Sequence, residues 1–167
     1  DTTAATARAV GEEFGLKVYD TWQKLAAECD ALSVAVPATY HHAMTIPLLE
    51  MKKHVLVEKP IAASRAEAEE LAELDKKYPG KLFVRQNRRF ETCFQHVREI
   101  IDSGILGKVH TIKLCRNAFS RRDDWQTLIK NNGGQLNNWG PHIIDQSLRF
   151  LESPVESIWS DLKLITG

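Results

Sequence analysis

The sequence predicts an α/β protein in which a partial parallel sheet precedes part of an α+β domain with an open, mainly antiparallel sheet. Three short apolar runs, rich in Val and Leu and too brief for helices, predict buried strands at 31–36, 54–57 and 81–84. Segments of helical composition separate them, at 39–51 and 64–78. This order makes two consecutive βαβ units. Because such crossovers are right-handed, we expect parallel strands with helices covering their faces.

The flanking segments of this half follow the same order. Ala- and Glu-rich composition with apolar residues four apart predicts an amphipathic helix at 2–14, followed by a minor strand at 17–19 and a short helix at 22–27. Ser64 and Glu67 stand in the S-x-x-E spacing that caps a helix by reciprocal hydrogen bonds, so a helix is expected to begin there. The first half is therefore α/β throughout.

The second half changes character. A helix is predicted at 94–103 and a half-buried strand at 108–117, where apolar and polar residues alternate. A long polar segment follows at 118–137, before a helix at 141–151 with Pro in its first turn and another strand at 155–165. Because a sheet of two strands is marginal alone, we expect further strands of this domain to lie outside the chain.

Composition excludes several classes of partner. Lys plus Arg and Asp plus Glu number 22 each among 167 residues, so no net field attracts the chain to nucleic acid or to a membrane surface. No apolar stretch approaches the roughly 20 residues that cross a bilayer, and no leader pattern opens the chain, so we expect a cytoplasmic protein. Three widely spaced cysteines without a CxxC pair are typical of reduced thiols: Cys29, Cys93 and Cys115.

The strongest functional lead is Lys59, near the end of the run VLVEKP at 55–60. Open parallel sheets hold their ligands at the carboxyl ends of the strands. Loss of water at such a place lowers the pKa of a Lys amine and suits it to proton transfer or to holding a substrate hydroxyl. The alternative is a solvated Lys just past a strand that Pro60 terminates.

A second candidate group lies on the helix predicted at 141–151. His142, Asp145 and Arg149 fall at i, i+3 and i+7 and therefore share one helix face. A carboxylate one turn from an imidazole can fix its tautomer and raise its basicity, as a general base requires. The alternative is a surface stripe in which Asp145 pairs with Arg149.

Three other features have competing explanations. Asp1 has the position of the acidic residue that ends the second strand of a dinucleotide fold and binds the adenosine ribose. A helix N-cap before Thr2 explains this residue equally well. The basic tract 85–90 follows a strand end, which favours a polar substrate pocket over nucleic-acid binding. The adjacent His41 and His42 are poorly placed to chelate one metal together, and we predict no metal site.

Four segments, VAVPATYHH, VLVEKPIAAS, RQNRRF and NNWGPHIIDQSLRF, occur in this order along the chain. Together, at these separations, they resemble the Gfo/Idh/MocA family of NAD(P)-dependent oxidoreductases, which includes glucose-fructose oxidoreductase and inositol dehydrogenases. The resemblance covers essentially the whole chain. It implies a Rossmann-like dinucleotide-binding domain at 1–88 and an α+β substrate and oligomerisation domain at 89–167.

The resemblance also implies what the chain lacks. The family's first βα unit carries a GxGxxG turn that grips the cofactor pyrophosphate, and no such unit precedes Asp1. We therefore expect the chain by itself to bind NAD or NADP weakly, to be inactive, and to expose sheet edges that favour self-association. The open sheet face of the family's second domain implies a homodimer or homotetramer of the whole protein.

Residue by residue, the resemblance implies three groups of site residues. Lys59 and His142 match the catalytic pair, in which the Lys holds the reacting hydroxyl and the His is the general base. The residues that match the cofactor side are Asp1, Pro37, His41, Glu58, Lys59 and Pro60. The residues that match the substrate side are Asn87, Arg89, Asn138 and Asp145.

One position departs from the family pattern, because many members place Asp where this chain has Asn138. An amide cannot act as a carboxylate acid or base, although it can hydrogen-bond a sugar hydroxyl. The resemblance implies hydride transfer between a nicotinamide cofactor and a sugar, polyol or related cyclic hydroxy compound. Two alternatives are an NAD-dependent glycosidase of the same family and a non-catalytic NAD-binding or scaffold protein, which Asn138 would favour.

Overall fold

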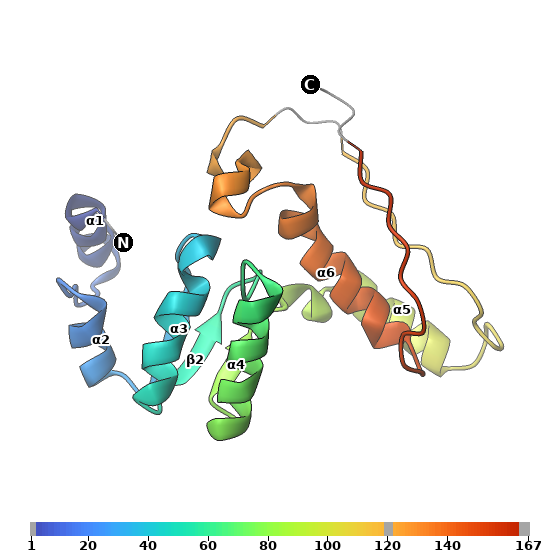
Figure 1. Cartoon of the computed structure of the whole chain (residues 1–167), viewed down its shortest axis with the longest axis horizontal. Coiled ribbons are helices and arrows are strands. Elements are labelled where there is room, and N and C mark those ends of the chain that lie inside the picture. Colours follow the sequence, from blue (N-terminus) through green and yellow to red (C-terminus); the bar gives the residue numbers. More distant parts are fainter. Residues whose placement is uncertain (1–2, 119–121, 164–167) are drawn as a thin grey trace.

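The computed structural model describes residues 3–118 and 122–163. In Figure 1, α3 and α4 flank the sheet, α1 and α2 lie beyond α3, and α5 and α6 lie beside each other on the other side. Helices, strands and 3₁₀ turns (η) follow in chain order: α1 (Ala4–Phe14), α2 (Trp22–Glu28), β1 (Ala31–Val34), η1 (Ala38–Tyr40), α3 (His41–Glu50), β2 (His54–Val57), α4 (Arg65–Lys77), β3 (Leu82–Val84), η2 (Asn87–Phe90), α5 (Thr92–Asp102), η3 (Trp125–Thr127), η4 (Ile129–Asn131) and α6 (Gln135–Phe150).

Three parallel strands form the centre of the first part. β1 pairs with β2 and β2 pairs with β3, so the order across the sheet is β1-β2-β3. One helix lies in each connection, α3 between β1 and β2 and α4 between β2 and β3. The predicted βαβ units and the parallel arrangement are confirmed. All three strands therefore deliver their carboxyl ends to one edge of the sheet.

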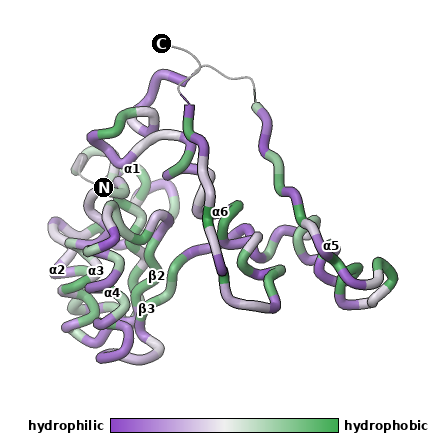
Figure 2. The backbone as a smooth tube through the Cα atoms, turned by 45° about the vertical axis from the view of Figure 1, so that its right-hand side comes forward, coloured by the Kyte–Doolittle hydropathy of each residue, from purple (hydrophilic) through white to green (hydrophobic). Residues whose placement is uncertain are grey.

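Alternation along the strands builds the core. Leu32 and Val34 of β1, and Val55 and Val57 of β2, are buried while the residues between them are exposed. Leu49 of α3 belongs to the same buried cluster. In Figure 2 the tube is hydrophobic along β2 and β3. One face of the sheet is thus closed by helices, and this burial is the main source of stability in the first part.

The start of α4 has the predicted capping arrangement. Ser64 Oγ accepts a hydrogen bond from the backbone N–H of Glu67 at 3.3 Å. The Glu67 carboxylate in turn accepts from the backbone N–H of Ala63 at 2.8 Å. The reciprocal bond therefore reaches the residue before the cap instead of Ser64 itself. The first bond satisfies a backbone donor that helix geometry leaves without an internal partner, and the second fixes the residue before the cap.

The turn η2 joins α6 to the end of the sheet. Arg89 of η2 donates to both carboxylate oxygens of Asp145 on α6, at 2.8 and 2.6 Å. Phe94 of α5 and Phe150 of α6 pack with their ring centroids 5.0 Å apart. A bidentate ion pair fixes both the distance and the orientation of its two partners. The position of α6 relative to the sheet is therefore set close to the carboxyl end of β3.

Three predicted strands do not form in the described part of the chain. Residues 17–19, 108–117 and 155–163 have no ladder partner there, and 164–165 lie outside the described residues. Apolar alternation indicates a buried face but cannot supply the neighbouring strand that completes the backbone hydrogen bonds. The extended segments after α5 and α6 overlap in Figure 1 and separate in the turned view of Figure 2. The open antiparallel sheet is not confirmed, and α6 begins at Gln135, earlier than predicted.

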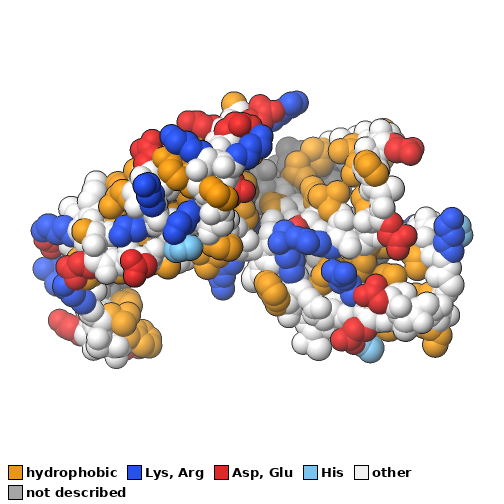
Figure 3. Space-filling model, turned by 90° about the horizontal axis from the view of Figure 1, so that it is seen from below, with side chains coloured by type: hydrophobic (Ala, Val, Ile, Leu, Met, Phe, Trp, Pro, Cys, Tyr) orange, Lys and Arg blue, Asp and Glu red, His pale blue; other side chains and the backbone are white. Residues whose placement is uncertain are grey.

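Charges of both signs cover the surface. Figure 3 shows Lys and Arg side chains intermingled with Asp and Glu side chains on the face in view. Within residues 3–118 and 122–163, no helix is both long and apolar enough to cross a bilayer. The three cysteines are free thiols, of which Cys29 is partly buried and the other two are exposed.

Truncation of the core on α3 tests this packing. Leu49→Ala is expected to lower the free energy of unfolding by about 2–5 kcal/mol, because a fully buried side chain leaves a cavity. The matched control Leu56→Ala removes a side chain that is 38% exposed on β2, and its expected cost is about 1 kcal/mol or less. Urea unfolding followed by circular dichroism measures both. Equal losses for the two variants would contradict the assigned core.

Candidate active site

A cavity of about 210 Å³ lies where the carboxyl ends of β1 and β2 face the segment 122–134 and the start of α6. This is the edge of a parallel sheet at which ligands bind. The lining combines loops after both strands with polar residues of the second part: Ala35, Val36, Ala38, His41, Glu58, Lys59, Pro60, Trp125, Gln126, Asn132, Gly133, Asn137 and Asn138. The cavity therefore belongs to both parts of the chain.

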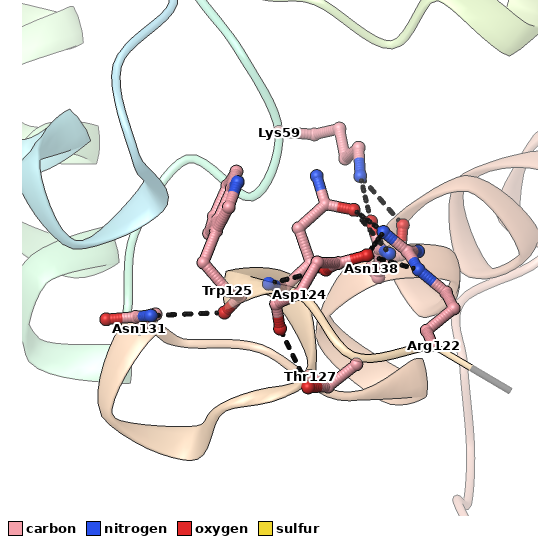
Figure 4. A network of polar contacts seen from close by, with 8 residues as sticks. Lys59, Arg122, Asp124, Trp125, Thr127, Asn131 and Asn138 are labelled. Carbon is pink, nitrogen blue, oxygen red and sulfur yellow. Dashed lines mark hydrogen bonds and ion pairs between the residues drawn. The ribbon is translucent and has the colours of Figure 1, made fainter.

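Lys59 crosses this cavity from the sheet to α6 (Figure 4). Its Nζ donates to the backbone oxygen of Asn138 at 2.8 Å and to the side-chain oxygen of the same residue at 2.9 Å. Burial lowers the pKa of Lys59, and the positive charges of Arg88 and Arg122 lower it further, against the opposite effect of Glu58. The amine consequently loses its proton more easily than an exposed lysine does.

An interruption in α6 lies where Lys59 arrives. Pro141 stands inside the helix and has no N–H, so the carbonyl of Asn137 lacks its usual helical donor. The next carbonyl along the chain, that of Asn138, accepts the bond from Lys59. A donor from outside the helix thus approaches at the turn where the helical ladder is incomplete.

His142 follows Asn138 by one turn of α6 and is 6% exposed. Its Nδ1 has no hydrogen-bond partner among the described residues, and its ring lies 5.9 Å from the Trp139 ring. Burial lowers the pKa of His142, and the positive charges of Lys59 and Arg88 lower it further. The imidazole is therefore neutral near pH 7 and able to accept a proton, although it lies outside the cavity lining.

The predicted pairing of His142 with Asp145 is wrong. Asp145 is bound by Arg89 through both oxygens, and one of these oxygens lies 4.0 Å from Arg149 Nε. A guanidinium is always charged and offers two parallel N–H groups, so it binds a carboxylate more strongly than a neutral imidazole does. Arg89 and Asp145 hold η2 against α6, and neither side chain lines the cavity.

The predicted cofactor-side residues have different surroundings. His41 is buried, with one ring nitrogen 2.6 Å from the Pro60 carbonyl oxygen and the other 2.9 Å from that of Val36. It therefore ties the loop after β1 to the loop after β2. Glu58 lines the cavity and forms an ion pair with Arg85. His41 thus organises the cavity wall, while Glu58 presents a carboxylate to it.

The remaining predicted residues lie away from this cavity. Pro37 lines a second, more open cavity of about 400 Å³, which also includes Tyr40 and Trp125. Asn87 is exposed and lines neither cavity. Asp1 lies outside the described residues. Among residues 3–118 and 122–163, no three His, Cys, Asp or Glu side chains are grouped so as to hold a metal ion.

Sequence reasoning missed the contribution of the segment 122–134. Trp125 and Gln126 of η3 line the cavity, and Figure 4 shows the Trp125 ring beside the loop that follows β2. Gln126 Oε1 accepts from Arg122 Nη2 at 2.5 Å and from Asn138 Nδ2 at 3.3 Å. A Trp within a polar stretch that ends in Asn-Asn-Gly-Gly is the signal by which these residues could have been found.

Gly133 allows this segment to fold back on itself. A Cβ at this position would lie 2.3 Å from the Gln126 carbonyl oxygen and 2.8 Å from that of Leu128. The backbone N–H of Gly133 donates to Leu128 O at 3.0 Å, and that of Gly134 donates to Gln126 O at 2.8 Å. Because both obstacles are backbone atoms, only glycine fits here. The turn therefore holds η3 over the cavity.

Together these groups can bind a hydroxyl and remove its proton. A lysine ammonium has three N–H groups, and two of those on Lys59 are taken by Asn138, so one is available to a ligand oxygen in the cavity. The neutral imidazole of His142, which lies on α6 one turn after Asn138, can accept a proton. The lining amides of Gln126 and Asn132 add donors and acceptors that suit a polyhydroxylated ligand.

Two family models match the chain. The model described as an oxidoreductase family with an NAD-binding Rossmann fold matches residues 1–86. The model described as the GFO/IDH/MocA C-terminal domain matches residues 94–167.

Relatives of known activity are similar over most of the chain. The myo-inositol 2-dehydrogenase of Thermotoga maritima and the D-glucoside 3-dehydrogenase of Escherichia coli are each 28% identical to it, over 92% of the chain and 46% of the relative. An NAD-binding protein of Listeria innocua has a similar structure, with a TM-score of 0.78 and 28% identity, over 92% of this chain and 46% of that one. The chain thus spans about half the length of the relatives it matches.

Titration of His142 tests the electrostatics of the site. Its pKa is expected below the usual value of about 6.5, because burial and the charge of Lys59 both disfavour the imidazolium. Lys59→Met removes that charge with little change in shape, so the pKa of His142 is expected to rise towards the usual value. NMR titration of the imidazole measures both, with the exposed Lys113→Met as control. A pKa that falls or stays constant in Lys59→Met would contradict the coupling.

Substitution of Gly133 tests the turn over the cavity. Gly133→Ala is expected to open the segment 122–134, because its new methyl group meets two backbone carbonyls. Amide hydrogen exchange of that segment should become at least about tenfold faster, as expected for a local opening made easier by more than 1.4 kcal/mol. Gln135→Ala, at an exposed position two residues later, is the control. Unchanged exchange in Gly133→Ala would refute the close approach.

Proposed function

Because the chain belongs to the Gfo/Idh/MocA family of oxidoreductases, we propose that the whole protein transfers a hydride between NAD or NADP and a hydroxyl-bearing carbon of a sugar, polyol or related cyclic compound. The observation that carries the proposal is the Lys59 amine, held by Asn138 in a cavity at the carboxyl edge of the parallel sheet. A neutral His142, on α6 like Asn138, completes the pair of residues that the proposed reaction requires.

The sheet edge fits a nicotinamide nucleotide. The loops after β1 and β2 both open into the cavity, and this is where doubly wound sheets bind dinucleotides. We assign the cofactor contacts to Pro37, Glu58 and Pro60, with His41 holding the two loops together. When bound, the nicotinamide ring supplies the hydride acceptor. We also propose that residues 1–88 form the dinucleotide-binding domain and residues 89–167 the substrate domain.

The residues of the chain perform the proton chemistry. The free N–H of Lys59 donates to the oxygen of the substrate hydroxyl and orients it within the cavity. His142 takes the hydroxyl proton as the adjacent carbon is oxidised to a carbonyl, and a bound nicotinamide would accept the hydride that this carbon loses. Asn138 contributes no proton, because a neutral amide is neither a useful acid nor a useful base. Its role is to hold Lys59.

The relatives support a cyclic hydroxy compound as the substrate. Two similar proteins are named as dehydrogenases of myo-inositol and of D-glucosides, whose rings carry several hydroxyl groups. The amide side chains in the cavity lining, on Gln126, Asn132, Asn137 and Asn138, offer paired donors and acceptors for such a ring. Trp125 provides an aromatic surface beside them.

Nicotinamide reduction by the whole protein, followed at 340 nm against a panel of inositols and glycosides, tests the proposal. His142→Ala is expected to lower kcat/KM by about 10²- to 10⁴-fold, because it removes the general base. Lys59→Met is expected to lower it by about 10²- to 10³-fold, because it removes a donor to the reacting oxygen. Matched controls are the exposed His110→Ala and Lys113→Met, for which activity should not change.

Each alternative outcome would point to another activity. Variants of Lys59 and His142 as active as the unaltered protein would remove both residues from the mechanism. Release of an aryl leaving group from glycosides without net cofactor reduction would indicate an NAD-dependent glycosidase. Tight cofactor binding without turnover of any polyol or glycoside would indicate a non-catalytic protein.

A further inference from the structure

We propose that Gln126, backed by Arg122, is a positioning residue that orients the side-chain amide of Asn138 so that its oxygen faces Lys59. The proposal rests on the function assigned to Lys59 above. It gives the segment 122–134, which covers the cavity, a defined role in setting the hydrogen bonds of the reacting site.

The side-chain amide of an asparagine can turn either of two groups towards Lys59. Its oxygen accepts a hydrogen bond, whereas its NH₂ group only donates. The structure places Asn138 Oδ1 2.9 Å from Lys59 Nζ, and the backbone oxygen of the same residue 2.8 Å from it. With the amide rotated, two donors would face each other in a partly buried place. The useful orientation therefore has to be selected against an alternative of nearly equal shape.

The selection starts at Arg122, whose guanidinium has donors only. Arg122 Nη2 donates to Gln126 Oε1 at 2.5 Å, so the amide oxygen of Gln126, and not its nitrogen, must lie at this point. The same oxygen accepts from Asn138 Nδ2 at 3.3 Å. Asn138 is then left with its oxygen towards Lys59. The hydrogen bonds thus form one chain in which every donor and acceptor is determined by the first.

The residues that precede η3 keep this chain of hydrogen bonds in place. Arg122 Nε donates to Asp124 Oδ2 at 2.8 Å, and the other oxygen of Asp124 accepts from the backbone N–H of Gln126 at 2.9 Å. One carboxylate therefore holds both the guanidinium and the backbone of the residue that orients Asn138. Figure 4 shows Arg122 and Asp124 beside Asn138, the residue of α6 to which the side chain of Lys59 extends.

A carboxylate at position 138 would not need such a device. Both oxygens of an aspartate accept hydrogen bonds, so either orientation serves a lysine ammonium equally well. The requirement for Gln126 therefore follows from the amide at Asn138. This dependence separates orientation from a general structural role of η3, because only orientation should become dispensable when Asn138 is replaced by Asp.

A double-mutant cycle measures that dependence. The pKa of Lys59 is followed by NMR of lysine labelled at Cε in the unaltered chain, in Gln126→Leu, in Asn138→Asp and in the double variant. Gln126→Leu is expected to lower the pKa of Lys59, because the released amide can turn its NH₂ group towards the ammonium. In the Asn138→Asp background, Gln126→Leu is expected to leave the pKa unchanged. The exposed Gln135→Leu is the matched control.

A second variant keeps the result interpretable if Gln126→Leu loosens η3. Gln126→Glu preserves an acceptor for Arg122 and Asn138 and adds a negative charge, so it is expected to raise the pKa of Lys59. In the whole protein, Gln126→Leu should lower kcat/KM at least about tenfold more in the Asn138 background than with Asn138→Asp, where only a contact of Gln126 with the substrate is lost.

The outcomes separate this proposal from the assigned function. Equal shifts of the Lys59 pKa in both backgrounds, or no shift in either, would overturn the orienting role of Gln126. The expected shifts together with no turnover of any hydroxy compound would support the orienting role and refute the proposed reaction instead.

Discussion

The hydrogen bonds from the Lys59 ammonium to the two oxygens of Asn138 are the interaction on which the cavity depends. They join residues 79 positions apart and connect the parallel sheet to α6. A partly buried ammonium loses hydration, and two charge-assisted bonds offset much of that loss. The loss is visible in the lowered pKa of Lys59. The same contact therefore joins the sheet to α6 across the cavity and holds the amine where burial lowers its pKa.

The ion pair between Arg89 and Asp145 is a second contact that joins α6 to the first part of the chain. Both oxygens of Asp145 are used by one guanidinium, which fixes η2 against α6. Burial and the cations Lys59 and Arg88 disfavour the charged form of the His142 imidazole, and together they outweigh the opposite effects of the more weakly acting carboxylates of Glu91 and Glu58. Asp145, which Arg89 binds, and the neutral His142 thus have separate surroundings on α6.

The sequence was sufficient for features that depend on neighbours along the chain. Short Val-rich runs with helices between them predicted the three parallel strands, and the end of VLVEKP correctly indicated Lys59 as the residue at the sheet edge. The strands predicted at 108–117 and 155–165 depended on a partner strand, which no local pattern supplies. The predicted partner of Asp145 was wrong for a similar reason. Its actual partner, Arg89, is 56 residues away, and a helical spacing can indicate only pairs that are close along the chain. The contribution of Gln126 was missed because a polar segment gives no periodic signal.

The amide at position 138 has a further consequence for how protons are shared in the site. Lys59 and His142 are close enough for the charge of one to lower the pKa of the other, and the effect is reciprocal, because the interaction energy belongs to the pair. A carboxylate at position 138, beside Lys59 and one helical turn before His142, would favour both charged forms and weaken this competition, whereas the neutral Asn138 leaves it intact. With Lys59 protonated, His142 is therefore held neutral. The pair then offers one donor and one acceptor at the same time, which is the combination that removal of a hydroxyl proton requires.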